Sequence, residues 1–154
     1  MRLIIIGCEY AGTTTLAIGI REWAQVNLGL TLPVHDHWKL PHVSGHPPYE
    51  AITILSNDEK RQVLGLTPKL KEIFTRYTTY YHTPSSPNEP GSILVGYYLE
   101  DLIYAEIFFS YGEEDGPGDR RVIAQDVEQR LLENAPDTVL VLVKADPKVL
   151  IARM

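Results

Sequence analysis

The first fifteen residues constrain the fold of this chain more than any other segment. An apolar run, Leu3–Ile6, leads directly into the loop Gly7–Gly12, and three threonines then open a helix-like stretch. A buried strand, a glycine-containing loop and a helix start, in this order, form a unit in which proteins hold phosphate groups. Glycines let backbone N–H groups converge on phosphate oxygens, and the positive end of the helix dipole points at them. The sequence therefore predicts a phosphate-binding loop.

This loop matches the pattern G-x-x-x-x-G-K-[ST] except at one position, where Thr13 stands in place of the lysine that normally reaches the terminal phosphates. Thr14 keeps the hydroxyl that ligates Mg²⁺ in such loops, and it is the expected metal ligand. A tight strand-to-helix turn, with Gly12 as a hinge, is the alternative that the missing lysine leaves open. The residues expected to bind the phosphates are Gly7, Tyr10, Ala11, Gly12, Thr13, Thr14 and Thr15.

Composition narrows the class of protein. A chain of 154 residues with 44% hydrophobic and 22% charged residues is typical of one globular domain. The net charge of −6 and the lack of a basic stripe argue against nucleic acid as a partner. The apolar N-terminus ends too soon, at Gly7, for a membrane span or a signal peptide. A single cysteine, Cys8, fits a reducing compartment, so a cytoplasmic protein without a membrane partner is expected.

Four apolar runs without polar alternation predict strands that are buried on both faces, as in a parallel sheet covered by helices. The fold class expected is therefore α/β. The strands are expected at Leu3–Ile6, Leu30–His35, Ile93–Val95 and Val139–Val143.

Helix starts are marked by Thr67-Pro68, by Asp119 and by Asp146-Pro147. The second of these helices is expected to run to about Glu133. In the first, five apolar side chains recur at helical spacing and predict a stripe that faces the core: Leu70, Ile73, Phe74, Tyr77 and Tyr81.

Two arginines, Arg120 and Arg121, fall at the start of the helix that follows Asp119. The helix dipole disfavours cations there, so these side chains need a compensating anion. A neighbouring carboxylate, such as Asp119 or Glu114, or the phosphate of a ligand would supply it.

The sequence resembles the P-loop nucleoside and nucleotide kinases in four features that follow one another along the chain. These features are the loop, the acid after the second strand, the long helix with Arg76, and the run Val139–Pro147 before Arg153. The resemblance implies a parallel sheet with helices on both sides and the strand order 2-3-1-4-5. This sequence supplies four strands, hence 2-3-1-4. The family's lid and fifth strand follow the helix that begins here at Asp146. The resemblance thus implies that residues 1–154 are a single domain without its C-terminal lid and last strand.

The resemblance also implies ATP and Mg²⁺ as cofactors, with phosphoryl transfer to a small acceptor such as a nucleoside or nucleotide. Asp36 resembles the acid that these kinases place near the acceptor, and Arg76 resembles their substrate-contacting arginine. A capping carboxylate at the strand end and a solvated helix face are the respective alternatives. Glu100 and Asp101 come one turn later than the family's third-strand acids, and surface charges at a helix start are the simpler interpretation.

Two classes of function remain open at this stage. Asp36, Arg76 and Thr14 favour an enzyme, in which Lys144, Lys39 or a lid arginine replaces the missing lysine. Thr13 favours a degenerate module that binds a nucleotide or phosphate without turnover. The histidines at positions 35, 37, 42 and 46 are expected to line a substrate cleft, with a metal site as the alternative. The oligomeric state is open, and a homodimer is among the options.

Overall fold

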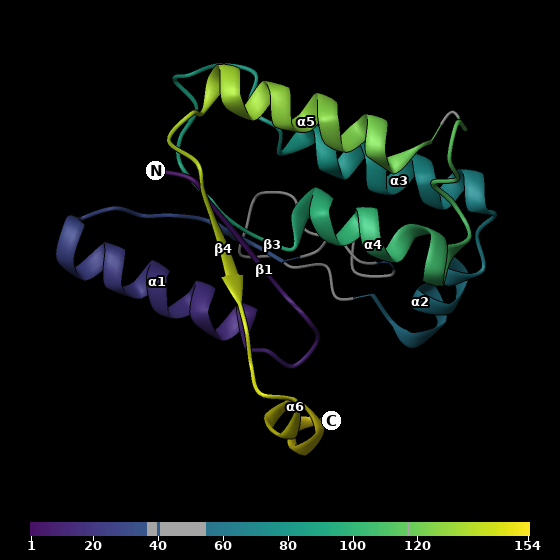
Figure 1. Cartoon of the computed structure of the whole chain (residues 1–154), viewed down its shortest axis with the longest axis horizontal. Helices are drawn as coiled ribbons and strands as arrows, with labels where there is room; N and C mark the ends of the chain where they lie inside the picture. Colours follow the sequence, from purple (N-terminus) through teal and green to yellow (C-terminus); the bar gives the residue numbers. More distant parts are fainter. Residues whose placement is uncertain (37–39, 41–54, 117) are drawn as a thin grey trace.

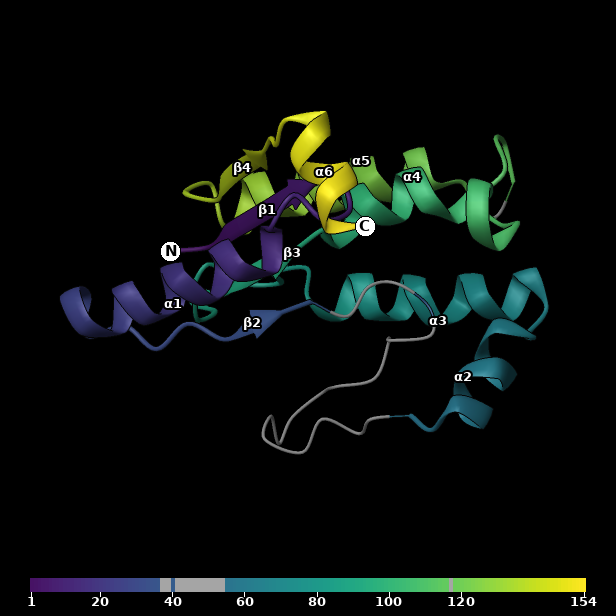
Figure 2. The same cartoon turned by 90° about the horizontal axis from the view of Figure 1, so that it is seen from below.

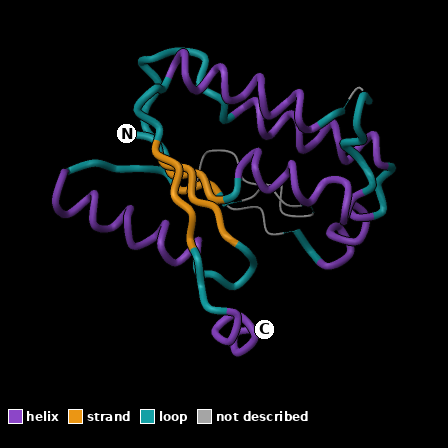
Figure 3. Tube along the Cα trace, in the orientation of Figure 1, coloured by secondary structure: helices purple, strands orange, loops and turns teal. Residues whose placement is uncertain are grey.

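The protein is described by a computed structural model that covers residues 1–36, 40, 55–116 and 118–154. Its strands form one four-stranded sheet in the order β2-β3-β1-β4. Every pair in this sheet is parallel, and β1 lies between β3 and β4 (Figure 3). The strand order predicted from the sequence is therefore confirmed. The strands are β1 (Leu3–Gly7), β2 (Val34–His35), β3 (Ile93–Val95) and β4 (Val139–Val143).

Six helices complete the described fold: α1 (Thr13–Leu28), α2 (Asn57–Leu64), α3 (Pro68–Tyr81), α4 (Tyr97–Phe109), α5 (Arg120–Asn134) and α6 (Pro147–Arg153). Figure 1 shows α1 on one side of the sheet, with α3, α4 and α5 grouped on the other. None of the helices in the described ranges is both long and apolar enough to cross a membrane.

The central strands β1 and β3 are buried on both faces, as their unbroken apolar runs predict. The same prediction is wrong for β4, in which Val139, Leu140 and Leu142 are exposed. Ile5 packs in a cluster with Ala17 and Ala24 of α1. Its neighbour Ile4 points the other way and packs in a second cluster with Val127 of α5. Alternate residues of β1 thus join two separate cores, and α1 and the α4–α5 pair are fixed to opposite faces of one strand.

The predicted strand Leu30–His35 is wrong over its first four residues, because only Val34 and His35 pair with β3. Gly29 ends α1 in a left-handed conformation, and the N–H of Leu30 is still bonded back to the carbonyl of Ala24. Pro33 has no N–H to give to a ladder, although its carbonyl accepts a bond from Ile93. The apolar run is therefore mostly a connection rather than a strand.

The predicted core-facing stripe of α3 is also wrong. Leu70, Ile73, Phe74, Tyr77 and Tyr81 are all exposed, and Tyr77 retains 73% of its accessible surface. The buried face of the helix carries Glu72, Thr75, Thr78 and Thr79 instead.

Threonine side chains can occupy this buried face because each hydroxyl has a partner within its own helix. The hydroxyls of Thr75, Thr78 and Thr79 donate to the carbonyl oxygens of the residues four positions earlier, at about 3.0 Å in each case. A satisfied hydroxyl costs little to bury, whereas an unsatisfied one costs about 1–3 kcal/mol. A prediction from hydrophobic periodicity alone takes no account of these hydrogen bonds within the helix. It therefore assigns the wrong face of α3 to the core.

A buried charge cluster joins α3, α4 and α5. Arg120 lies 3.0 Å from the carboxylate of Asp101 and 3.4 Å from that of Glu72, and all three side chains are buried. Burial raises the pKa of the Asp101 carboxyl, and the adjacent Arg120 guanidinium acts in the opposite direction. Tyr111 donates to Asp101 at 2.7 Å, and its ring lies under the guanidinium. The anion that Arg120 needs at the helix start is thus supplied by carboxylates from two other helices.

Arg121 is compensated as expected from the sequence. Its guanidinium pairs with Asp119 at 2.8 Å and with Glu114 at 2.5 Å. The carboxylate of Asp119 also accepts from the backbone N–H of Arg121 and so caps α5. These contacts hold the pKa of Asp119 below its usual range.

Arg120→Met is expected to lower the free energy of unfolding by about 3–5 kcal/mol, because it leaves the buried carboxylate of Asp101 without its cation and removes one of the two guanidinium groups beside Glu72. Arg130→Met on the same helix is the matched control. Arg130 is half exposed and pairs with Asp126 near the surface, so its loss is expected to cost under about 1 kcal/mol. Urea denaturation of both variants measures the difference. Equal losses would show that the cluster does not hold the three helices together.

Candidate phosphate-binding site

The loop between β1 and α1 turns sharply at two residues. Tyr10 and Gly12 both have left-handed backbones, with φ of 64° and 98°. Between them, the N–H of Ala11 donates to the carbonyl of Cys8 at 3.0 Å and closes a tight turn. Gly12 tolerates this conformation because it has no Cβ, while Tyr10 is strained by it. Non-glycine residues in this region cluster at functional sites.

Gly7 is required by close packing rather than by its backbone angles. It pairs with Val143 at the end of the β1–β4 ladder. A Cβ at this position would lie 2.8 Å from the carbonyl oxygen of Val143 and 2.9 Å from the Cγ2 of Thr13. The carboxyl end of β4 and the start of α1 therefore press together on this glycine.

The N-terminus of α1 has no side-chain cap. Gly12 occupies the cap position, and no acidic residue lies in the first turn. The helices α3 and α4 also lack a side-chain cap, whereas the side chains of Ser56, Asp119 and Asp146 cap α2, α5 and α6. The first N–H groups of a helix need acceptors, which side chains, water or an anionic ligand can supply.

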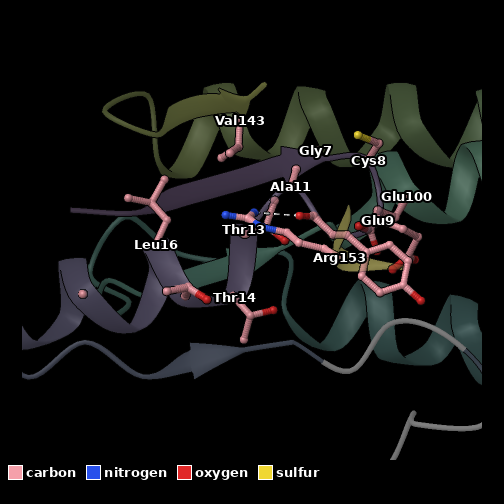
Figure 4. Close-up of a pocket in the computed structure, with 14 residues that line it drawn as sticks. Gly7, Cys8, Glu9, Ala11, Thr13, Thr14, Leu16, Glu100, Val143 and Arg153 are labelled. Carbon is pink, nitrogen blue, oxygen red and sulfur yellow. Dashed lines mark hydrogen bonds between the residues drawn. The ribbon is translucent and has the colours of Figure 1, made fainter. Parts of the chain in front are cut away.

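These N–H groups open onto a cavity of about 920 Å³, a size typical of small-molecule sites (Figure 4). All seven residues predicted to bind phosphate line it. The remaining lining residues come from the loop, from α1, from the end of β4, from α4 and from α6: Cys8, Glu9, Leu16, Gly19, Glu100, Val143 and Arg153.

Asp36, which the resemblance places near a phosphoryl acceptor, lies beside the first turn of α1 and is not among the residues that line the cavity. Its Oδ2 accepts a hydrogen bond of 2.5 Å from the hydroxyl of Thr14, the expected metal ligand. The pair joins the residue after β2 to the first turn of α1, and both side chains are exposed. A hydroxyl and a carboxylate are the oxygen donors that Mg²⁺ prefers, so the residues present fit that ion.

Arg76 is not brought to this cavity. It extends from α3 and pairs with Glu72 of the preceding turn at 2.9 Å. Together with Lys69 it lines a second, smaller cavity of about 370 Å³ between the start of α3 and the loop after α4. In the structure, the two residues predicted to be catalytic therefore lie at different sites.

Glu100 belongs to the wall of the phosphate-loop cavity, whereas the sequence favoured a surface charge at a helix start. It is only 8% exposed. Its side chain folds back over Gly96, where a Cβ would lie 2.2 Å from the Glu100 carboxyl carbon. Gly96 also has a φ of 80°, so the turn from β3 into α4 requires glycine on two grounds. The sequence offered two signals for this acid, its place one turn after the third strand and a glycine four residues before it.

Asp101 turns away from the cavity and joins the buried cluster around Arg120. Of the two lysines expected to replace the missing one, Lys39 lies outside the described residues. Lys144 is exposed and does not line the cavity, whereas Arg153 does.

His35 is buried, and its ring lies 4.3 Å from that of His82, centroid to centroid. The histidines at positions 37, 42 and 46 lie outside the described residues. Within the part of the chain that the structure covers, no group of three or more His, Cys, Asp or Glu side chains could hold a metal ion.

Comparison with protein-family models, with curated proteins and with solved structures gives no match to this chain.

Proposed function

We propose that this chain is a P-loop domain of the nucleoside and nucleotide kinase type. It binds ATP with Mg²⁺ and, in its complete form, transfers the terminal phosphoryl group to a small acceptor such as a nucleoside or nucleotide. The observation that carries this proposal is the Thr14–Asp36 hydrogen bond beside an uncapped helix N-terminus in a cavity of about 920 Å³.

The position of the cavity in the sheet supports the proposal. β1 is followed by α1 on one face, and β3 is followed by α4 on the other. When the chain passes from two neighbouring parallel strands to helices on opposite faces of the sheet, a crevice forms at the carboxyl ends of those strands. Proteins of the α/β class bind ligands in this crevice. The loop after β1 and Glu100 of α4 both border this crevice.

The chemistry of the residues in the cavity supports the same conclusion. The N–H groups at the start of α1 would hold phosphate oxygens, and the Thr14 hydroxyl would hold Mg²⁺. When bound, Mg²⁺ neutralises charge that develops on the transferred phosphoryl group. Asp36, which accepts a hydrogen bond from Thr14, would orient the hydroxyl of an acceptor. Catalysis of this type rests on positioning and charge, so few groups are needed.

The sheet edge also agrees with the family pattern. β4 pairs only with β1 in the described sheet, and Val139, Leu140 and Leu142 are at least half exposed. This is the edge at which the kinase pattern 2-3-1-4-5 places a further strand. A fifth strand and a lid beyond the four described here remain part of the proposal.

A module that binds a nucleotide or phosphate without turnover is the second candidate. Two observations favour it. Thr13 provides no charge for the terminal phosphates, and Arg76 lies in the second cavity rather than at the loop. Turnover is what separates the two candidates, since both require the loop to bind phosphate.

ATP is expected to bind to the full chain in a calorimetric titration, and more tightly with Mg²⁺ than without it. Gly12→Asp places a carboxylate beside the loop and should weaken binding by about tenfold or more, because it repels the phosphates. Gly12→Asn is the matched control, since Asn has the same size and tolerates left-handed angles equally well. Equal affinity in the two variants would mean that the loop is not aimed at phosphate.

Asp36→Asn in a protein with its lid present is expected to lower turnover by about 10²–10⁴-fold and to leave ATP affinity nearly unchanged. This pattern is expected when a group acts in the transition state. Steady-state kinetics with a panel of nucleosides and nucleotides measures it. If the unsubstituted protein shows neither transfer nor hydrolysis with any acceptor, the enzyme proposal fails and the binding module remains.

A further inference from the structure

Arg153 reaches the phosphate loop from the opposite end of the chain. Its guanidinium Nη1 donates to the carbonyl oxygen of Tyr10 at 2.9 Å, across 143 positions of sequence. The same nitrogen lies 3.7 Å from the point where a Cβ of Gly12 would be. Figure 4 shows the side chain extended over the loop, inside the cavity that Thr13 and Thr14 line.

Two features of the fold set this position. The β1–β4 ladder ends at Gly7 and Val143, which brings the carboxyl end of β4 against the loop. α6 then starts after Asp146, whose side chain accepts from the N–H of Lys148 at 2.8 Å. Figure 1 shows α6 following β4 beyond the carboxyl end of the sheet, and Figure 2 shows the same helix from below. The arginine at the end of α6 is therefore directed at the loop by the sheet register and by a capped helix.

The guanidinium retains capacity for a ligand. Its hydrogen bond to the carbonyl of Tyr10 uses a single N–H of the five that arginine carries. Within the described part of the chain it forms no ion pair, although Glu9 and Glu100 line the same cavity. A guanidinium stays protonated at all relevant pH values and matches phosphate oxygens in pairs.

We propose that Arg153 supplies the positive charge that residue 13 lacks, and that it contacts the terminal phosphates of a bound nucleoside triphosphate. The inference rests on the proposed function, because it assumes that the loop binds a triphosphate. It makes α6 part of the nucleotide site. It also explains how a loop with Thr13 can retain affinity for a ligand of high negative charge.

The test is a double-mutant cycle on ATP affinity in the presence of Mg²⁺. Arg153→Gln is expected to weaken binding by about tenfold to a hundredfold, as for loss of a hydrogen bond to a charged group. Lys148→Gln removes the same charge from the same helix, away from the cavity, and is expected to change affinity less than about twofold. Circular dichroism checks that each variant folds.

Thr13→Lys completes the cycle, because it restores a cation at the family position. It is expected to recover the binding lost in Arg153→Gln, and to add clearly less to the unsubstituted chain than to that variant. Two results would overturn the role of Arg153 without affecting the proposed function. One is a loss of ATP affinity in Arg153→Gln that is no larger than the loss in Lys148→Gln. The other is an equal gain of ATP affinity from Thr13→Lys in the unsubstituted chain and in Arg153→Gln. Absence of ATP binding to the unsubstituted chain would overturn the proposed function as well.

Discussion

The parallel pairing of β1 with both of its neighbours is the constraint on which the candidate site depends. Because all three strands run in the same direction, the segments that follow them emerge at one edge of the sheet. The loop follows β1, Glu100 follows β3 and Arg153 follows β4. Gly7 tightens this arrangement, since it allows Val143 and Thr13 to approach each other where any side chain would clash.

The charges around the loop make Mg²⁺ central to the proposed binding. The helix dipole and Arg153 provide positive potential, while Asp36, Glu9 and Glu100 lie at or near the same cavity. A triphosphate without a metal ion would meet these carboxylates directly, and repulsion between like charges would oppose binding. A divalent cation held by the phosphates and the hydroxyl of Thr14 would offset that repulsion. The acids around the loop are therefore a reason to expect tighter binding when a cation accompanies the ligand.

The regular elements of the sheet and the loop were predictable from the sequence, because both depend on local patterns. Unbroken apolar runs gave three of the four strands, and the spacing of Gly7, Gly12 and Thr14 predicted the loop that now lines a cavity. α2 was not predicted, although Ser56 and Glu59 form a capping box at its start. That short helix has no buried residue and therefore no apolar stripe that would have marked it in the sequence.

The remaining features depend on contacts between distant segments. The exposed stripe of α3 became evident only when Thr75 and its neighbours were seen to satisfy their hydroxyls within the helix and to pack inward. Glu100 and Arg153 were part of the family resemblance, but their place at the loop is set by strand register and by the turn at Gly96 and was not predicted from the sequence. For Arg76 the sequence suggested a role that the packing does not support. Its position along the chain suggested a substrate contact, but the packing of α3 directs its side chain to another cavity.

A crystal structure of the protein with Mg²⁺ and a non-hydrolysable ATP analogue tests the phosphate loop most directly. The expected result is a chain of phosphates at the N-terminus of α1, with oxygens bonded to backbone N–H groups between Tyr10 and Thr15. The metal ion should lie beside the hydroxyl of Thr14. A structure in which the analogue binds elsewhere, while the loop keeps its present conformation without a phosphate, would contradict the proposal.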